Sequence, residues 1–153
     1  MKWFFRFLYQ LSLSLWVGGM SCFAFLVTPK LFSELGRDQA AAIVGFLFPL
    51  YYPAVLAVSV VALLAYMTYS SGGLTSKLIL GILGTAVLIN GYQLLFLFPE
   101  TADLANQIGS FEAMSKEHPL RKSFLLLHIQ ANILGLVVLI EGVVLMFFSS
   151  LKK

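Results

Sequence analysis

Apolar residues fill four long blocks of the chain, separated by short polar, proline-containing or glycine-containing stretches. A helix needs about 20 apolar residues to cross a bilayer. Four blocks meet that length: residues 8–28, 40–70, 78–98 and 124–148. Lipid offers the backbone no hydrogen-bond partners, so each block is expected to be helical. The pattern predicts an all-α integral membrane protein, with residues 1–153 forming one antiparallel bundle of four transmembrane helices.

Prolines and glycines lie at the expected borders of these blocks. Pro29 follows the first block, residues 71–73 (Ser-Gly-Gly) follow the second and Pro99 follows the third, and such residues commonly end helices. Pro49 and Pro53 lie inside the second block. Each removes a backbone donor and clashes with the carbonyl four residues earlier. We expect the second helix to be kinked at Pro49/Pro53, or else a short interfacial helix followed by a span that starts near Pro53.

Composition agrees with a membrane protein. Hydrophobic residues make up 59% of the chain and charged residues 11%, against roughly 25% charged in an ordinary soluble protein. The net charge of +3 comes from scattered lysines and arginines, which argues against a nucleic-acid partner and leaves the lipid bilayer as the expected one. The single cysteine, Cys22, excludes an intrachain disulfide and a cysteine cluster for zinc or iron–sulfur.

The orientation is left open by charge, because each side carries five Lys and Arg residues. Lys2 and Arg6 precede an apolar run without a small-residue cleavage site, so the first block is expected to be a retained span. We expect the inner membrane of a bacterium, with both termini cytoplasmic and the long polar loop at residues 100–122 on the other side. Five aromatic residues are expected as interface anchors on the terminal side: Trp3, Tyr9, Tyr66, Tyr69 and Phe147.

A set of polar side chains is expected at one depth in the bundle. Counted inward from the loop side, Asn90 and Asn132 both lie eight residues deep, roughly 12 Å at 1.5 Å per residue. The predicted ligand-binding layer is Tyr51, Tyr52, Asn90, Gln93, His128 and Asn132. These groups either bond neighbouring helices together, at about 0.6 kcal/mol each, or line a cavity for a small molecule, ion or cofactor. His128 is the candidate metal ligand.

Glu141 is an acid inside the fourth block, and no Lys or Arg lies inside any block to pair with it. An ionised carboxylate there would cost at least about 2.5–3.5 kcal/mol. We therefore expect a protonated Glu141, hydrogen-bonded to a hydroxyl of Ser12, Ser59 or Thr85. Gln130 shares its helix face. The pair is interpreted as an intramembrane proton site or a clasp between helices, and a homo-oligomer or a partner helix could bind through it.

Several stretches resemble one family. They are LSLSLWVGGMSCFAFLVTPKLF, GFLFPLYYP, the segment from Asn90 to Pro99, and RKSFLLLHIQAN. Together they resemble the transmembrane protein 205 family, which implies a four-span membrane protein without an established activity. The association of its human member with resistance to platinum drugs implies metal or drug handling. The residues that carry over are Phe48, Pro49, Tyr51, Asn90, Pro99, Phe124 and His128. The family tends to place an asparagine where this chain has Gly135.

A weaker likeness joins WVGG…TPKLF to the four-helix membrane protoporphyrinogen oxidases, which bind haem. Tyr9 stands roughly where those proteins carry a histidine, so haem would have His128 as its one ligand within a span. The expected function is non-enzymatic binding or transport of a small molecule or metal ion through the polar layer. The alternatives are a haem- or quinone-dependent membrane oxidoreductase and an assembly or structural membrane subunit.

Overall fold

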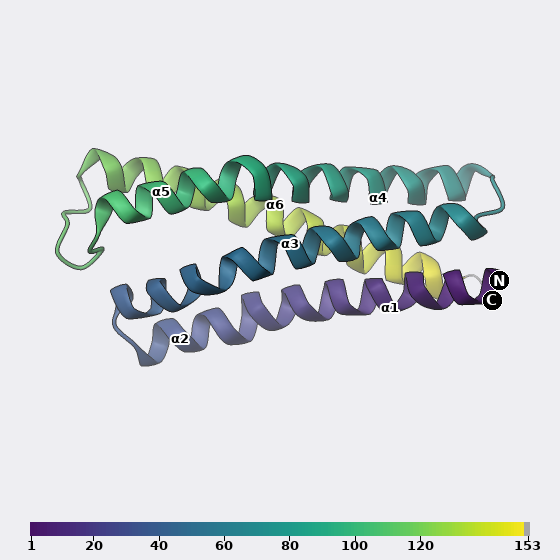
Figure 1. Cartoon of the computed structure of the whole chain (residues 1–153), viewed down its shortest axis with the longest axis horizontal. Helices are drawn as coiled ribbons and strands as arrows, with labels where there is room; N and C mark the ends of the chain where they lie inside the picture. The colour runs from purple at the N-terminus through teal and green to yellow at the C-terminus, as the bar shows by residue number, and fades with distance from the viewer. Residues whose placement is uncertain (152–153) are drawn as a thin grey trace.

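The computed structural model describes residues 1–151, and these form helices joined by short connections, with no strand (Figure 1). The elements in chain order are α1 (Lys2–Ser21), η1 (Cys22–Val27), α2 (Thr28–Glu34), α3 (Arg37–Tyr69), α4 (Leu74–Tyr92), η2 (Gln93–Leu97), α5 (Phe98–Ile108) and α6 (Pro119–Leu151). The segments η1 and η2 are π-helical. The predicted all-α class is confirmed.

Four continuous rods are long and apolar enough to cross a membrane. They are Lys2–Glu34, Arg37–Tyr69, Leu74–Ile108 and Pro119–Leu151. Successive rods run in opposite directions, and both termini lie at one end of the bundle, here named the terminal end (Figure 1). The opposite end, which holds the connection at residues 109–118, is the loop end. The rod α6 contacts α5 and α1, and Figure 1 shows it crossing the bundle obliquely from one to the other.

The prolines at the expected borders do not end their helices, so that prediction was wrong. A proline has no N–H to bond to the carbonyl four residues earlier. Each of these prolines is preceded by a π-helical segment, in which the N–H of Thr28 bonds to the carbonyl of Phe23 and the N–H of Phe98 bonds to that of Gln93. The helix continues past Pro29 and Pro99, each in the first turn of the next element. The connection predicted at residues 100–122 is therefore shorter, because most of it is α5 and the start of α6.

The helix α3 contains Pro49 and Pro53 and is unbroken from Arg37 to Tyr69. The alternative of a separate interfacial helix was therefore wrong. Figure 1 shows that α3 changes direction along the half that contains the two prolines. The carbonyls of Gly45 and Pro49 lose their usual donors there, because the residue four positions later is a proline in each case.

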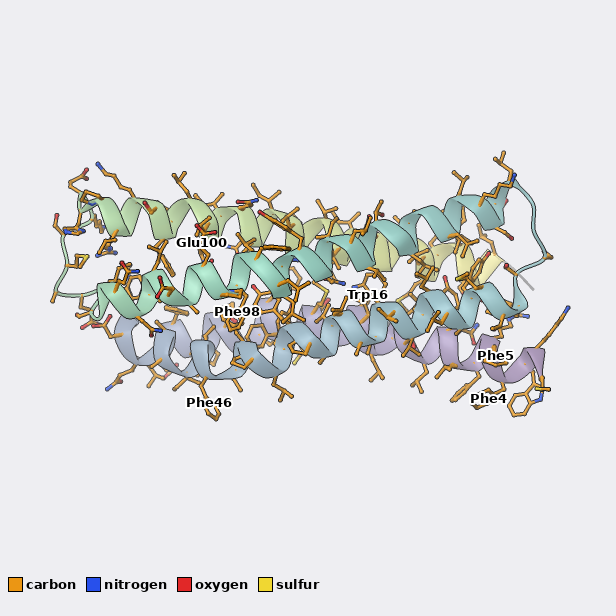
Figure 2. All side chains as sticks on the ribbon, turned by 45° about the horizontal axis from the view of Figure 1, so that its top comes forward. Phe4, Phe5, Trp16, Phe46, Phe98 and Glu100 are labelled. Carbon is orange, nitrogen blue, oxygen red and sulfur yellow. The ribbon has the colours of Figure 1, made fainter. Side chains whose placement is uncertain are left out.

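The outer surface is apolar. In the most apolar window of each rod, only 17–28% of residues are buried in the protein, so most apolar side chains face outward. Phe46 is 83% exposed and Leu88 74% exposed, and Figure 2 shows Phe46 pointing away from the bundle. An exposed apolar surface of this extent requires a lipid environment.

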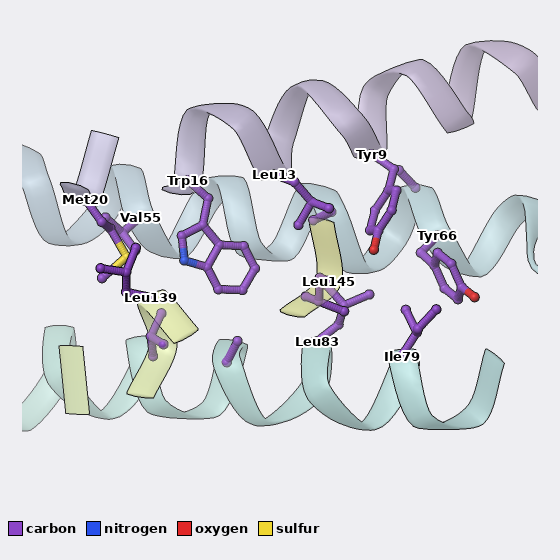
Figure 3. Packing of buried hydrophobic residues seen from close by; sticks show 14 residues of the cluster. Tyr9, Leu13, Trp16, Met20, Val55, Tyr66, Ile79, Leu83, Leu139 and Leu145 are labelled. Carbon is purple, nitrogen blue, oxygen red and sulfur yellow. The ribbon is translucent and has the colours of Figure 1, made fainter. Parts of the chain in front are cut away.

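The interior of the terminal half is a close-packed apolar core (Figure 3). Tyr9, Leu13 and Trp16 from α1 meet Leu83 from α4 and Leu145 from α6, all 1% exposed or less. The rods α1 and α6 approach closely at Gly142, where an added Cβ would lie 2.8 Å from Val17 Cγ2. This core stabilises the terminal half of the bundle. The polar and aromatic residues described next lie toward the loop end.

Candidate functional site

The inward face of the third rod carries two amides. Ala86, Asn90, Gln93 and Leu97 are between 0% and 4% exposed, and their spacing of three or four residues places them on one stripe of the helix. An amide in this position is desolvated on folding and needs a hydrogen-bond partner. Asn90 has such a partner within the protein, whereas Gln93 has none among the described residues.

Asn90 is held by α3. Its Nδ2 donates to Ser59 Oγ at 3.3 Å, and the Ser59 hydroxyl donates to the carbonyl of Leu56 at 2.8 Å. Ser59, rather than Tyr51 or Tyr52, is thus level with Asn90. Tyr51 lies eight residues earlier in α3, about 12 Å nearer the loop end. The contact of Asn90 joins two helices and fits the structural interpretation of this residue.

Gln93 is 3% exposed, and no hydrogen bond joins its side chain to any described residue. Its amide offers two N–H donors and a carbonyl acceptor. Burying such a group fully and without a partner costs roughly 1–3 kcal/mol, and the Gln93 residue is close to that limit at 3% exposed. Gln93 is also the first residue of η2, and π-helical turns inside α-helices frequently mark functional sites. The sequence identifies this residue, but only the structure shows that it lacks a partner.

Five aromatic rings lie toward the loop end from Gln93. We name them the aromatic cluster: Phe23, Phe48, Tyr51, Tyr52 and Phe98. The ring centroids are 4.6 Å apart for Phe23 and Tyr51, 5.3 Å for Phe48 and Tyr52, and 5.2 Å for Tyr52 and Phe98. The cluster joins η1, α3 and α5 and brings together both predicted tyrosines. The site prediction lacked Phe23 and Phe98, although Phe98 directly precedes Pro99 in the sequence.

The predicted α6 residues take different positions. His128 is half-buried and stacks on Phe124, with centroids 5.6 Å apart and planes at 11°. Asn132 is exposed on the outer surface, so the structure does not bring it to the other amides. The inward side of α6 instead passes through Val138 and Gly142. In residues 1–151, no group of three His, Cys, Asp or Glu side chains is placed to hold a metal ion, and His128 as a metal ligand stays a prediction.

Glu141 and Gln130 both contact the third rod. The Thr85 hydroxyl lies 2.7 Å from Glu141 Oε1 and 2.9 Å from the carbonyl of Ile82. Gln130 Nε2 donates to the hydroxyl of Tyr92 at 3.2 Å. The second carboxyl oxygen of Glu141 is buried without a partner. Of the three hydroxyls considered from sequence, Thr85 is the one that bonds to Glu141.

The loop end is closed by an ordered connection. Asp38, in the first turn of α3, accepts hydrogen bonds from the Ser110 hydroxyl and the Phe111 N–H, both at 2.6 Å. Arg121 donates to the carbonyls of Phe111 and Met114 at 2.6 and 2.7 Å. These contacts fix residues 110–114 over the end of the bundle.

The residues do not fit a haem with two axial ligands. Tyr9, which stands in place of the expected histidine, packs at the terminal end against Tyr66 and Tyr69, with centroids 5.2 and 6.0 Å apart. His128 packs against Phe124, near the start of α6 at the loop end. The two side chains therefore face different halves of the bundle.

Four apolar rods with a polar and aromatic interior define a multi-pass integral membrane protein. The chain belongs to the family described as Domain of unknown function (DUF4149), whose model matches residues 11–110. The matched segment contains Tyr51, Tyr52, Asn90 and Gln93 and ends before α6. No curated protein and no solved structure matches the chain.

Proposed function

We propose that the protein binds a small organic molecule in the loop half of the bundle, between Gln93 and the aromatic cluster, and that it does so without catalysing a reaction. The observation that carries this proposal is the side chain of Gln93, a residue only 3% exposed whose amide has no hydrogen bond to a described residue. A bound polar group would supply the hydrogen bonds that the protein does not. Asn90, by contrast, is already bonded to Ser59.

The chemistry of the surrounding residues favours a neutral, ring-containing ligand with one polar group. The five rings of the aromatic cluster offer faces for stacking, at distances typical of aromatic pairs. None of the cluster residues, nor Gln93, carries a formal charge at neutral pH. A charged ligand would lose its hydration without an opposite charge in return, at a large cost.

We propose further that the protein transports such a molecule across the bacterial inner membrane. The likeness to the transmembrane protein 205 family, with its implied drug handling, supports that role. Binding of a metal ion by His128, which lies outside the aromatic cluster, is a separate prediction from this one.

Native mass spectrometry of protein purified from its own membranes tests the binding. We expect wild type to carry a small-molecule adduct and Gln93→Leu to lose it, because leucine fills similar space without hydrogen-bonding groups. Gln10→Leu is the matched control, since Gln10 is exposed on α1 and its replacement should leave the adduct in place. If Gln93→Leu kept the adduct, the proposed binding site at Gln93 would be wrong.

Two simple measurements separate the alternatives. An absorbance spectrum with a Soret band would favour the haem-dependent oxidoreductase, whereas an optically silent sample would favour the binding protein. Cross-linking in native membranes addresses the assembly subunit, and recovery of monomer alone would count against it. The contacts of Gln130 and Glu141 with α4 of the same chain already engage part of the surface proposed for a partner.

A further inference from the structure

A cavity opens at the terminal end of the bundle, away from the proposed binding site. It has a volume of about 440 Å³, and we name it the tyrosine cavity. Its lining includes Arg6, Tyr9, Tyr66, Tyr69, Ser70 and Phe148. Tyr9 and Tyr66 were expected as interface anchors on the terminal side, but each is only 1% exposed. They line an internal space instead.

The hydroxyl of Tyr9 is buried and has no hydrogen-bond partner. Its ring is fixed between those of Tyr66 and Tyr69. Tyr66 differs, because its hydroxyl donates to Ser76 Oγ at 3.4 Å. A buried hydroxyl without a partner carries a desolvation penalty, and a ligand in the cavity would remove that penalty by accepting its hydrogen bond.

The charges around the tyrosine cavity favour an anion. Arg6 lines it, and Lys2 and Lys77 lie on the same end of the bundle. The acidic residues lie elsewhere: six of the seven are in or beside the loop-end segments, and Glu141 is inside α6. Arginine and tyrosine hydroxyls are donors suited to phosphate oxygens.

The lining of the cavity also includes the apolar side chains of Ile79, Phe148 and Leu151, beside the hydroxyl-bearing Ser71 and Ser149. The cavity lies where the first apolar block begins, at residue 8, which is the depth of lipid headgroups in a spanning bundle. We propose that the tyrosine cavity binds the phosphate headgroup of an anionic phospholipid. The phosphate accepts hydrogen bonds from Tyr9 and Arg6, and the start of an acyl chain packs on Phe148 and Leu151.

Thermal unfolding of the full chain in a non-ionic detergent, titrated with phosphatidylglycerol, tests this proposal. We expect phosphatidylglycerol to raise the unfolding midpoint, and phosphatidylcholine of the same chain length to leave it unchanged. Tyr9→Phe should unfold at the wild-type midpoint without lipid, because the hydroxyl has no partner to lose. It should bind phosphatidylglycerol about tenfold more weakly, as expected for a hydrogen bond to a charged group.

A second pair of variants keeps the test independent of Tyr9. Arg6→Gln and Lys77→Gln each remove one positive charge from the same end, but only Arg6 lines the cavity. We expect Arg6→Gln to weaken binding and Lys77→Gln to bind as wild type does. Wild-type affinity in both Tyr9→Phe and Arg6→Gln, or equal stabilisation by phosphatidylcholine, would overturn the proposal. Equal stabilisation by soluble glycerol phosphate would overturn the lipid as the source of the phosphate.

Discussion

At the scale of single residues, hydrogen-bond partners separate two kinds of buried polar group. Groups bonded to another helix hold the bundle together, and groups without a partner are candidates for binding a ligand. Asn90 and Ser59 bond to each other across two helices, and the Tyr9 hydroxyl is buried without a partner. Gln93 is 3% exposed, and its side chain has no hydrogen bond to a described residue. The sequence places polar residues inside spans, but it does not state the register between α3 and α4. That register decides which residue meets which, and it brings Ser59 to Asn90 in place of the expected tyrosines.

Glu141 provides a prediction at this scale. The Thr85 hydroxyl has one proton, and it faces both the Ile82 carbonyl and Glu141 Oε1. Both contacts become hydrogen bonds if Thr85 donates to Ile82 and a protonated Glu141 donates to Thr85. We therefore expect infrared spectra at pH 7 to show a protonated carboxyl stretch that is lost in Glu141→Gln. Only carboxylate bands in wild type would contradict this.

The same clasp predicts a stability series. A glutamine at residue 141 can still donate to Thr85, so Glu141→Gln should keep the wild-type free energy of unfolding. Glu141→Leu should lose about 0.6 kcal/mol and at most about 1.7 kcal/mol, the range for hydrogen bonds between membrane helices. Unfolding in a denaturing detergent measures both. Equal losses in the two variants would show that the hydrogen bond contributes nothing.

At the scale of elements, the prolines show where reasoning from sequence fails. Pro29 and Pro99 were predicted as helix ends, yet both follow a π-helical segment that carries the helix onward. Whether a rod stops or continues depends on the packing of the next segment, and the local sequence does not contain that information. The sequence also does not show that Phe23 and Phe98, which lie within the predicted spans, reach Tyr51 and Tyr52 across the bundle.

The close approach of α1 and α6 gives a second prediction. A Cβ at residue 142 would lie 2.8 Å from Val17 Cγ2 and 3.5 Å from the Trp16 ring. Overpacking of this kind costs about 1–3 kcal/mol, so Gly142→Ala should lower the free energy of unfolding by that amount. Gly135→Ala is the matched control on the same helix, because nothing lies within 4 Å of its Cβ position. A similar loss in both variants would mean that the contact is not specific.

The connection at the loop end gives a third prediction. The carboxylate of Asp38 holds Ser110 and Phe111, so Asp38→Ala should loosen the connection and speed tryptic cleavage at Lys116. Asp103→Ala serves as the control, because among residues 1–151 the side chain of Asp103 bonds to Gln107 of its own helix and to no residue of the connection. An unchanged cleavage rate in Asp38→Ala would show that these two contacts do not order the connection.

At the scale of the whole molecule, the hydrophobic pattern predicts the class of fold, the number of spans and the placement of both termini at one end. These features depend on length and apolar content, which a sequence displays directly. The oblique path of α6 does not follow from them. Because α6 crosses the bundle, its inward side turns along its length, and Asn132 is left on the outer surface while Val138 and Gly142 face inward.

The orientation in the membrane is a prediction at this scale. With both termini at one end, we expect a C-terminal green fluorescent protein fusion to be fluorescent in the cytoplasm. A C-terminal alkaline phosphatase fusion should be inactive, because that enzyme needs an oxidising compartment. The reverse pair of results would place the connection at residues 109–118 in the cytoplasm.

The central claim is that the amide of Gln93 is kept unpaired for a ligand, and an experimental map of protein from its native membrane tests it most directly. We expect density that no side chain explains, within hydrogen-bonding distance of the Gln93 amide and bounded by Tyr52 and Phe98. A map in which Gln93 bonds to a neighbouring backbone carbonyl, with side chains filling the space beside the aromatic cluster, would contradict the account.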